Sequence, residues 1–164
     1  LSMAYERDFD GGVTKSDVLV YGKKEAPPFT WTYDADGFLT DISSPTRSFR
    51  SFSYEEGNLV RFMNTSFEYS DPALVGHPSA PDVVWGYMSL MEKNDPFICF
   101  PFLLGWYDKA SAQLPTKMIS PSPTGTGTVE CGLTYGFDED GYPVSMSWTE
   151  GNSEYRVEYI YGNL

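Results

Sequence analysis

The sequence repeats one hairpin-like pattern, and this repeat constrains the fold more than any other feature. FTWTYDADGFLTDI (residues 29–42) and LTYGFDEDGYPVSMSW (residues 133–148) each contain an alternating aromatic run, then Asp-x-Asp-Gly, then an aromatic residue and a second alternating run. FSYEEGNLVRF (residues 52–62) is a contracted copy, and VEYIYGN (residues 157–163) resembles the start of another. A unit of about 20 residues has the length of one β-hairpin.

The period of the repeat predicts strands with one apolar and one polar face. Residues 29–33 alternate aromatic rings with threonines, and successive strand side chains project to opposite faces. Apolar residues also occupy every second position in three further segments: Leu133, Tyr135 and Phe137; Val144, Met146 and Trp148; and Tyr155, Val157, Tyr159 and Tyr161. The residues between them are mostly polar, such as Ser145, Ser147, Thr149, Arg156 and Glu158. One buried and one wet face is typical of antiparallel sheets, and Asp-Gly favours tight hairpin turns.

We therefore expect a mainly β fold. Strands are predicted near residues 3–8, 13–21, 29–34, 38–43, 48–55, 58–69, 128–138, 142–150 and 153–161. Together they would form a single curved antiparallel meander sheet, or an open half-barrel, of about nine strands. SPSPTGTGT (residues 120–128) is predicted to be a flexible loop that returns the chain to the sheet.

The middle of the chain breaks the β pattern. Apolar residues recur at helical spacing from Val84 to Met91, and PFICFPFLLGWY (residues 96–107) is apolar on every side. We expect a helical insertion over residues 82–110, packed on the concave apolar face of the sheet. Because the hairpins on both sides of the insertion need each other to bury that face, residues 1–164 are predicted to form one β-rich domain.

Charge and hydropathy exclude several partners. The formal net charge of −12 repels phosphate, so nucleic acid is not expected to bind. The longest apolar stretch, residues 96–107, is shorter than the roughly 20 residues of a spanning helix, so no transmembrane segment is expected. The first residues show no basic stretch followed by an apolar run, so we expect that any export signal was removed or never existed.

No sequence pattern identifies a catalytic residue, a metal site or a cofactor. Residues 34–37 and 138–141 lack the following glutamate of a calcium loop and are interpreted as turns. His77 is the only histidine and lies in an expected loop, so no Ser or Cys triad can be named. Gly125 and Gly127 are not followed by the Lys-Ser/Thr pair of a phosphate loop. We expect no catalytic residues, no metal and no cofactor.

Two groups of residues leave alternatives open. The 23 acidic residues always offer carboxylate pairs, but most lie at turns or on polar strand positions; the individual candidates are Glu55, Glu56, Glu68, Glu130, Glu154 and Glu158. Cys99 and Cys131 permit either one disulfide or two buried thiols.

The aromatic residues raise the question of carbohydrate stacking. The chain has 12 Tyr, 11 Phe and 4 Trp, and flat rings pack on sugar faces at low entropic cost. Most of these rings fall on the alternating positions assigned to the core. Trp85, Trp106 and Tyr107 do not, and they are the candidate ligand-binding residues.

The hairpins and one central segment resemble a known family. The Asp-x-Asp-Gly-aromatic hairpins are similar to the YD-type repeats of surface proteins, and LLGWYDKASAQLPTKM (residues 103–118) resembles the Gly…Lys-x-Ser-x-x-Leu-Pro segment of a group of Bacteroidetes lipoprotein domains of unknown function with a porin-like fold. The resemblance extends from about Asp17 to the end of the chain. It implies an open, strongly curved antiparallel sheet with helices against its concave side.

The same resemblance implies an exported protein of the periplasm or cell surface. Its tether would be a lipid on an N-terminal Cys upstream of Leu1, anchored in the outer membrane. The family assigns no catalytic residue. The leading hypothesis is a non-catalytic binding or scaffold module of the cell envelope, with a glycan, a peptide or a partner protein as ligand. The alternatives are a carrier of a small apolar or lipid-like ligand held between sheet and helices, and a carboxylate-pair hydrolase.

Overall fold

The computed structural model describes residues 2–7, 13–20, 23–24, 29–45, 47–77, 84, 110–122 and 125–160, with side chains for residues 29–45, 50–77, 84, 110–122 and 125–160. Thirteen strands lie in this part of the chain: β1 (Ser2–Arg7), β2 (Val13–Val20), β3 (Lys23–Lys24), β4 (Phe29–Tyr33), β5 (Leu39–Ser44), β6 (Arg47–Glu55), β7 (Asn58–Phe62), β8 (Thr65–Glu68), β9 (Lys117–Pro121), β10 (Thr128–Gly132), β11 (Thr134–Phe137), β12 (Pro143–Glu150) and β13 (Ser153–Glu158).

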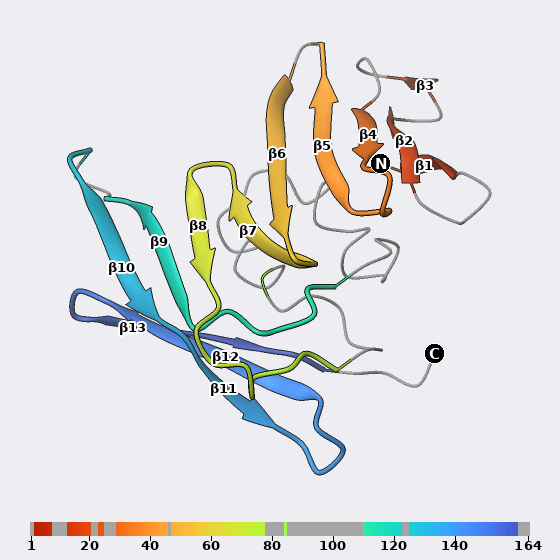
Figure 1. Cartoon of the computed structure of the whole chain (residues 1–164). Coiled ribbons are helices and arrows are strands. Elements are labelled where there is room, and N and C mark those ends of the chain that lie inside the picture. The colour runs from red at the N-terminus through yellow and green to blue at the C-terminus, as the bar shows by residue number, and fades with distance from the viewer. Residues whose placement is uncertain are drawn as a thin grey trace.

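The strands form two antiparallel sheets. Ten strands follow the order β1-β2-β4-β5-β6-β7-β8-β9-β10, with β3 paired to β2, and β11-β12-β13 form a second sheet. Figure 1 shows the large sheet curving from β1 to β10 and the small sheet crossing below it. The meander order and the antiparallel pairing confirm the predicted mainly β fold. The prediction of a single sheet of about nine strands was wrong, and the larger sheet ends at β1 and β10 without closing on itself.

Two turns repeat the same local geometry. In the β4–β5 hairpin the Asp34 Oδ1 accepts hydrogen bonds from the amides of Asp36 (3.0 Å) and Phe38 (2.9 Å). In the β11–β12 hairpin the Asp138 Oδ1 accepts from the equivalent amides of Asp140 (3.1 Å) and Tyr142 (2.8 Å). The following glycines, at positions 37 and 141, have φ angles of 84° and 86°. The acidic residues therefore stabilise turns, as the sequence predicted.

A β-bulge directly after the turn is the second shared feature of the hairpins. The pairing skips one residue in β4–β5, in β6–β7 and in β11–β12. Since a bulge reverses the alternation, the residues two and five positions after each turn glycine lie on the same face. All six are buried: Leu39 and Ile42, Leu59 and Phe62, and Pro143 and Met146. Strict two-residue alternation therefore holds before each turn and shifts after it.

The core lies on the face where the rings were expected. Phe29 and Trp31 are 2% and 4% exposed, whereas Thr30 and Thr32, which alternate with them, are exposed. Trp148 is 6% exposed, and Tyr33 and Tyr135 pack against the core as partly buried residues. These side chains confirm a dry surface shared by both sheets. Phe137, expected on the same face, is 43% exposed, so the prediction was wrong at that position.

Three expectations about the strands need correction. The single strand predicted for residues 58–69 is two strands, β7 and β8, because the chain turns at Met63, which has a φ of 53°. The strand β9 was missed, since its end lies in the Pro/Gly/Ser-rich stretch that we interpreted as loop. Ser145, expected on the wet face, is 5% exposed. It packs over Gly136, where a Cβ would lie 2.8 Å from the Ser145 hydroxyl, so the glycine makes room for it.

Tyr155 also departs from its expected place. It was assigned to the buried face but is 40% exposed, because β13 is an outer strand and the ring covers the end of the core. Its ring stacks on Trp148, with centroids 5.3 Å apart and planes inclined by 10°. The exposed ring therefore shields Trp148 from solvent.

The predicted helical insertion of residues 82–110 lies outside the described residues, apart from Val84 and Ala110. Val84 is 1% exposed and belongs to the core cluster. The described part of the chain contains no helix with the length and hydropathy of a membrane span.

The segment that follows the insertion is fixed to the sheet by buried polar contacts. The Ser111 hydroxyl accepts a hydrogen bond from the Leu59 amide at 3.0 Å, next to the bulge in β7. Leu114 is 3% exposed, and the carbonyl of the buried Pro115 accepts from the Tyr135 hydroxyl at 2.7 Å. The Ser-x-x-Leu-Pro part of the family-like segment is thus structural, because it joins both sheets.

We predict that Gly37→Ala lowers the free energy of unfolding by about 1 kcal/mol, because an alanine at a φ of 84° is strained although no atom lies within 4 Å of its Cβ. Gly132→Ala is the control, since that site has neither a positive φ nor a neighbour within 4 Å. Urea denaturation measures both. An equal loss in the two variants would contradict the turn geometry.

We predict that Ser111→Ala costs about 1–3 kcal/mol of stability, because the Leu59 amide would lose its acceptor inside the core. Ser53 is exposed on β6, so Ser53→Ala should change stability by less than about 0.5 kcal/mol. Thermal or urea unfolding of the two variants, followed by circular dichroism, makes the comparison. A neutral Ser111→Ala would show that the contact does not fix the segment.

Candidate functional site

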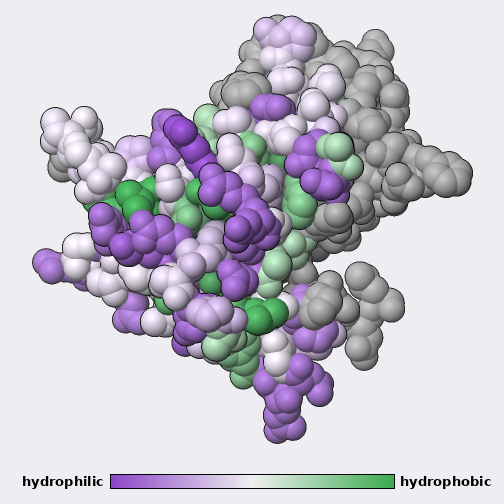
Figure 2. Space-filling view, viewed as in Figure 1, coloured by the Kyte–Doolittle hydropathy of each residue, from purple (hydrophilic) through white to green (hydrophobic). Residues whose placement is uncertain are grey.

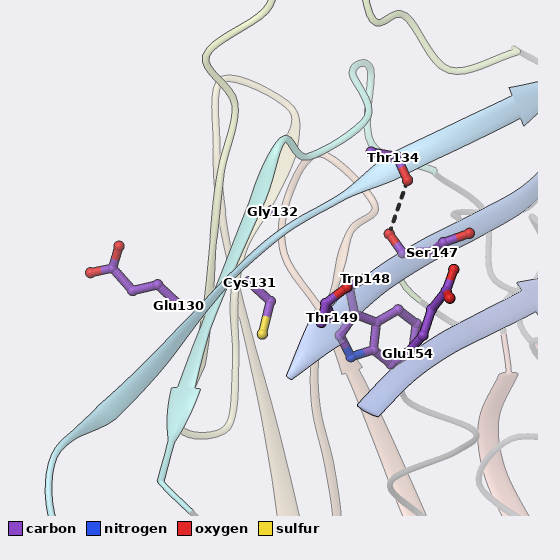
Figure 3. Close-up of a pocket in the computed structure, with 8 residues that line it drawn as sticks. All are labelled: Glu130, Cys131, Gly132, Thr134, Ser147, Trp148, Thr149 and Glu154. Carbon is purple, nitrogen blue, oxygen red and sulfur yellow. Dashed lines mark hydrogen bonds between the residues drawn. The ribbon is translucent and has the colours of Figure 1, made fainter. Parts of the chain in front are cut away.

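A pocket of about 320 Å³ opens where β10 and β12 diverge. Its lining residues come from three strands and from the start of β11; they are Glu130, Cys131, Gly132, Thr134, Ser147, Trp148, Thr149 and Glu154 (Figure 3). We call this pocket the fork. Its volume lies at the lower end of the range of small-ligand sites.

The fork exists because one continuous stretch of chain changes its pairing partner. β10 pairs with β9 as far as Gly132, and the Leu133 amide still donates to the Thr116 carbonyl on that side at 2.9 Å. One residue later, Thr134 pairs with Ser147 of β12. Beyond this point β12 runs on toward Glu150 while β10 stays with β9, so the two strands separate.

The open edge of β10 faces the fork. Backbone groups of successive strand residues point to opposite sides, and those of Leu133 point to β9. The N–H and C=O groups of Glu130 and Gly132 therefore point away from β9, toward the fork. No strand among the described residues pairs with β10 on this side.

Hydroxyl groups dominate the side-chain lining. Thr134 pairs with Ser147, and Thr149 pairs with Glu154, so all four side chains share the polar face of the small sheet. The Thr134 hydroxyl donates to the Ser147 carbonyl at 3.4 Å, drawn as the dashed line in Figure 3. Thr134, Thr149 and Glu154 are exposed to solvent. The fork therefore offers several donors and acceptors to a polar ligand.

The two carboxylates of the lining have different surroundings. Glu130 contacts the Lys117 ammonium group at 3.4 Å, and Glu68 contacts the same group at 3.0 Å. These carboxylates, Glu68 first, raise the pKa of Lys117 above its ordinary value. In Figure 3 the Glu130 side chain points away from the other labelled side chains. Of the two carboxylates that line the fork, Glu154 therefore lies beside the hydroxyl groups and Glu130 does not.

Cys131 forms the floor of the fork as a free, buried thiol. Burial, and secondarily the negative charge of Glu150, raises the pKa of this thiol above its ordinary value. A thiol is a weak nucleophile until it ionises, so these surroundings oppose nucleophilic catalysis. Of the two alternatives for the cysteines, the buried thiol holds at Cys131; Cys99 lies outside the described residues.

The ligand-binding residues predicted from the sequence, Trp85, Trp106 and Tyr107, lie outside the described residues. His77 is half-buried and stacks on Tyr142, with ring centroids 3.6 Å apart. No group of three or more potential metal ligands occurs among the residues that the structure describes.

Sequence reasoning placed the residues of the fork on strands but did not join them into a site. Ser147 and Thr149 were predicted on the wet face, and Glu154 was considered as one of several carboxylates. The available signal was the alternation of residues 128–138, which continues unbroken through Gly132. That signal does not reveal where a strand exchanges partners.

The visible surface of the described residues is mostly hydrophilic, with separate smaller hydrophobic areas (Figure 2). Among the large apolar side chains exposed in the described part are Val75 (58%), Phe137 (43%) and Ile160 (93%). Because these lie scattered, the fork is a better defined candidate site than an apolar patch.

The fold is similar to solved porin-like proteins. One, from Bacteroides vulgatus ATCC 8482, has a TM-score of 0.65 and 16% identity, over 99% of this chain and 79% of the other. Another, from Bacteroides uniformis ATCC 8492, has a TM-score of 0.57 and 15% identity, over 94% of this chain and 67% of the other. No family model matches the sequence, and no curated protein matches it. At these identities the likeness establishes a porin-like fold.

We predict that Cys131 reacts slowly with iodoacetamide in the folded protein at a pH of about 8, because its pKa is raised and its side chain is buried. The experiment uses a Cys99→Ser variant, so that Cys131 is the only thiol. Unfolding in guanidinium should speed the labelling at least about tenfold. Equal rates in the folded and unfolded protein would contradict the burial of the thiol.

Proposed function

We propose that this protein is a non-catalytic module of the bacterial cell envelope that binds a glycan in the fork. The main support for this proposal is that hydroxyl groups, a carboxylate and the N–H and C=O groups of the β10 edge surround one pocket of about 320 Å³. The pocket sits on paired strands, which hold such groups in fixed positions.

The chemistry of the lining fits a hydroxyl-rich ligand. Each sugar hydroxyl both donates and accepts, so a sugar needs both kinds of partner. Thr134, Ser147 and Thr149 supply both, the Glu154 carboxylate accepts, and the edge of β10 adds amides and carbonyls. A binding site for an apolar or lipid-like ligand would need mostly apolar walls, so the fork does not support the carrier alternative.

A binding role is further supported because the thiol and the two carboxylates that line the fork are not arranged for catalysis. The Cys131 thiol has a raised pKa, and Glu130 is engaged with Lys117 on the other side of β10. A carboxylate-pair hydrolase needs two carboxyl groups that face each other across the substrate, and in Figure 3 Glu130 and Glu154 point in different directions.

Location in the envelope is supported by the porin-like fold of the two Bacteroides proteins. The hairpins and the segment at residues 103–118, which resemble those of Bacteroidetes lipoprotein domains, point the same way. We therefore propose export to the periplasm or cell surface, with an outer-membrane tether through a lipid upstream of Leu1.

We predict saturable binding to at least one oligosaccharide on a glycan array, and a loss of at least about tenfold in affinity for Gly132→Leu. A side chain at Gly132 has open space around its Cβ, so leucine should fill the fork without disturbing the strand. Titration calorimetry on the best array ligand compares the wild type, Gly132→Leu and Gly132→Ala, where the alanine variant is the control for the backbone.

Absence of binding to every glycan on the array would refute the proposed function. Binding that Gly132→Leu leaves unchanged would move the glycan site away from the fork. Trp85→Ala and Trp106→Ala then test the candidates named from the sequence, because loss of a stacking ring should weaken binding there.

A further inference from the structure

We infer that the fork selects amino sugars over neutral and acidic ones, and that Glu154 is the residue that sets this preference. The inference rests on the proposed function and adds the charge class of the ligand. It follows from the balance of charges around the pocket.

The cations near the fork are already engaged by carboxylates. Lys117 contacts both Glu68 and Glu130, at 3.0 Å and 3.4 Å. Arg156, which pairs with Ser147 across the small sheet, contacts Glu158 at 3.2 Å. Both cations lie beside the pocket, and neither lines it. Their charge is therefore compensated before a ligand arrives.

Glu154 stands in a different position. It lines the fork, it is exposed, and its cross-strand neighbour on the same face is the hydroxyl of Thr149. Arg156, two residues along β13 on that face, is engaged by Glu158. Figure 3 shows its carboxylate on the same side of the small sheet as Ser147. A ligand in the fork thus meets an anionic acceptor flanked by hydroxyls, inside a chain whose formal net charge is −12.

This arrangement discriminates among sugars by charge. An ammonium group of an amino sugar would form a charge-assisted hydrogen bond with Glu154, which is about twice as strong as a neutral one. The neighbouring sugar hydroxyls would remain matched by Ser147 and Thr149. A uronate or sulfated sugar would instead place like charges a few ångströms apart, which opposes binding.

The test compares three trisaccharides by titration calorimetry at low ionic strength: one of glucosamine, one of N-acetylglucosamine and one of galacturonate. We expect the glucosamine trisaccharide to bind about tenfold more tightly than its N-acetylated form, and the galacturonate trisaccharide not to bind measurably. Raising the salt concentration should reduce this preference, because the fork is open to solvent.

Glu154→Gln should abolish the preference for the free amine while keeping the shape of the side chain. Glu139→Gln is the matched control, because it removes the same charge at an exposed turn residue that does not line the pocket, and it leaves the Arg156–Glu158 ion pair intact. The control should keep the preference. Circular dichroism verifies that both variants fold.

The outcomes separate this inference from the proposed function. If glycans bind and Gly132→Leu blocks them, but glucosamine has no advantage, the inference is wrong and the proposed function stands. The inference is also wrong if the advantage survives Glu154→Gln or vanishes equally in Glu139→Gln. If no glycan binds at all, both fail.

Discussion

The structure depends on one continuous run of core-facing side chains that serves two sheets. From Val129 to Tyr135, every second residue faces the core, yet the backbone exchanges β9 for β12 as its partner at Leu133. The exchange is possible because a strand carries hydrogen-bonding groups along both of its edges, perpendicular to its side chains, so it can pair on either edge while the same side chains face the core. Burial of Cys131, Leu133 and Tyr135 holds the run in place, and the divergence of the two partners creates the fork.

Much of the large sheet was predictable, because its hairpins depend on local chemistry. The Asp-x-Asp-Gly turns determine the strand ends through hydrogen bonds within five residues, as at Asp34 and Asp138. Alternation placed Phe29 and Trp31 correctly for the same local reason. After each turn the prediction weakened, because the bulge depends on pairing across the hairpin. Leu59 and Phe62 share a face only when one residue between them is skipped.

The missed features are those that depend on partners far along the chain. β9 shows little alternation of apolar and polar residues. It is a strand because it pairs with β8 and β10, and local sequence does not reveal that pairing. The site is still less local, since Gly132 and Glu154 approach each other only through the exchange of partners at Leu133. Periodicity could assign Thr149 to a wet face, but it could not show which wet residues surround one pocket.

The same geometry explains why the fork can hold a fixed shape. Trp148 is buried behind it and covered by Tyr155, and Lys117 links β8, β9 and β10 on the exposed face of the larger sheet. The ion pairs are exposed and add little stability individually, so the buried ring carries most of the support. A site whose polar groups are held by paired strands loses little conformational entropy on binding. Selectivity at the fork should then depend on the positions of its charges rather than on rearrangement of its walls.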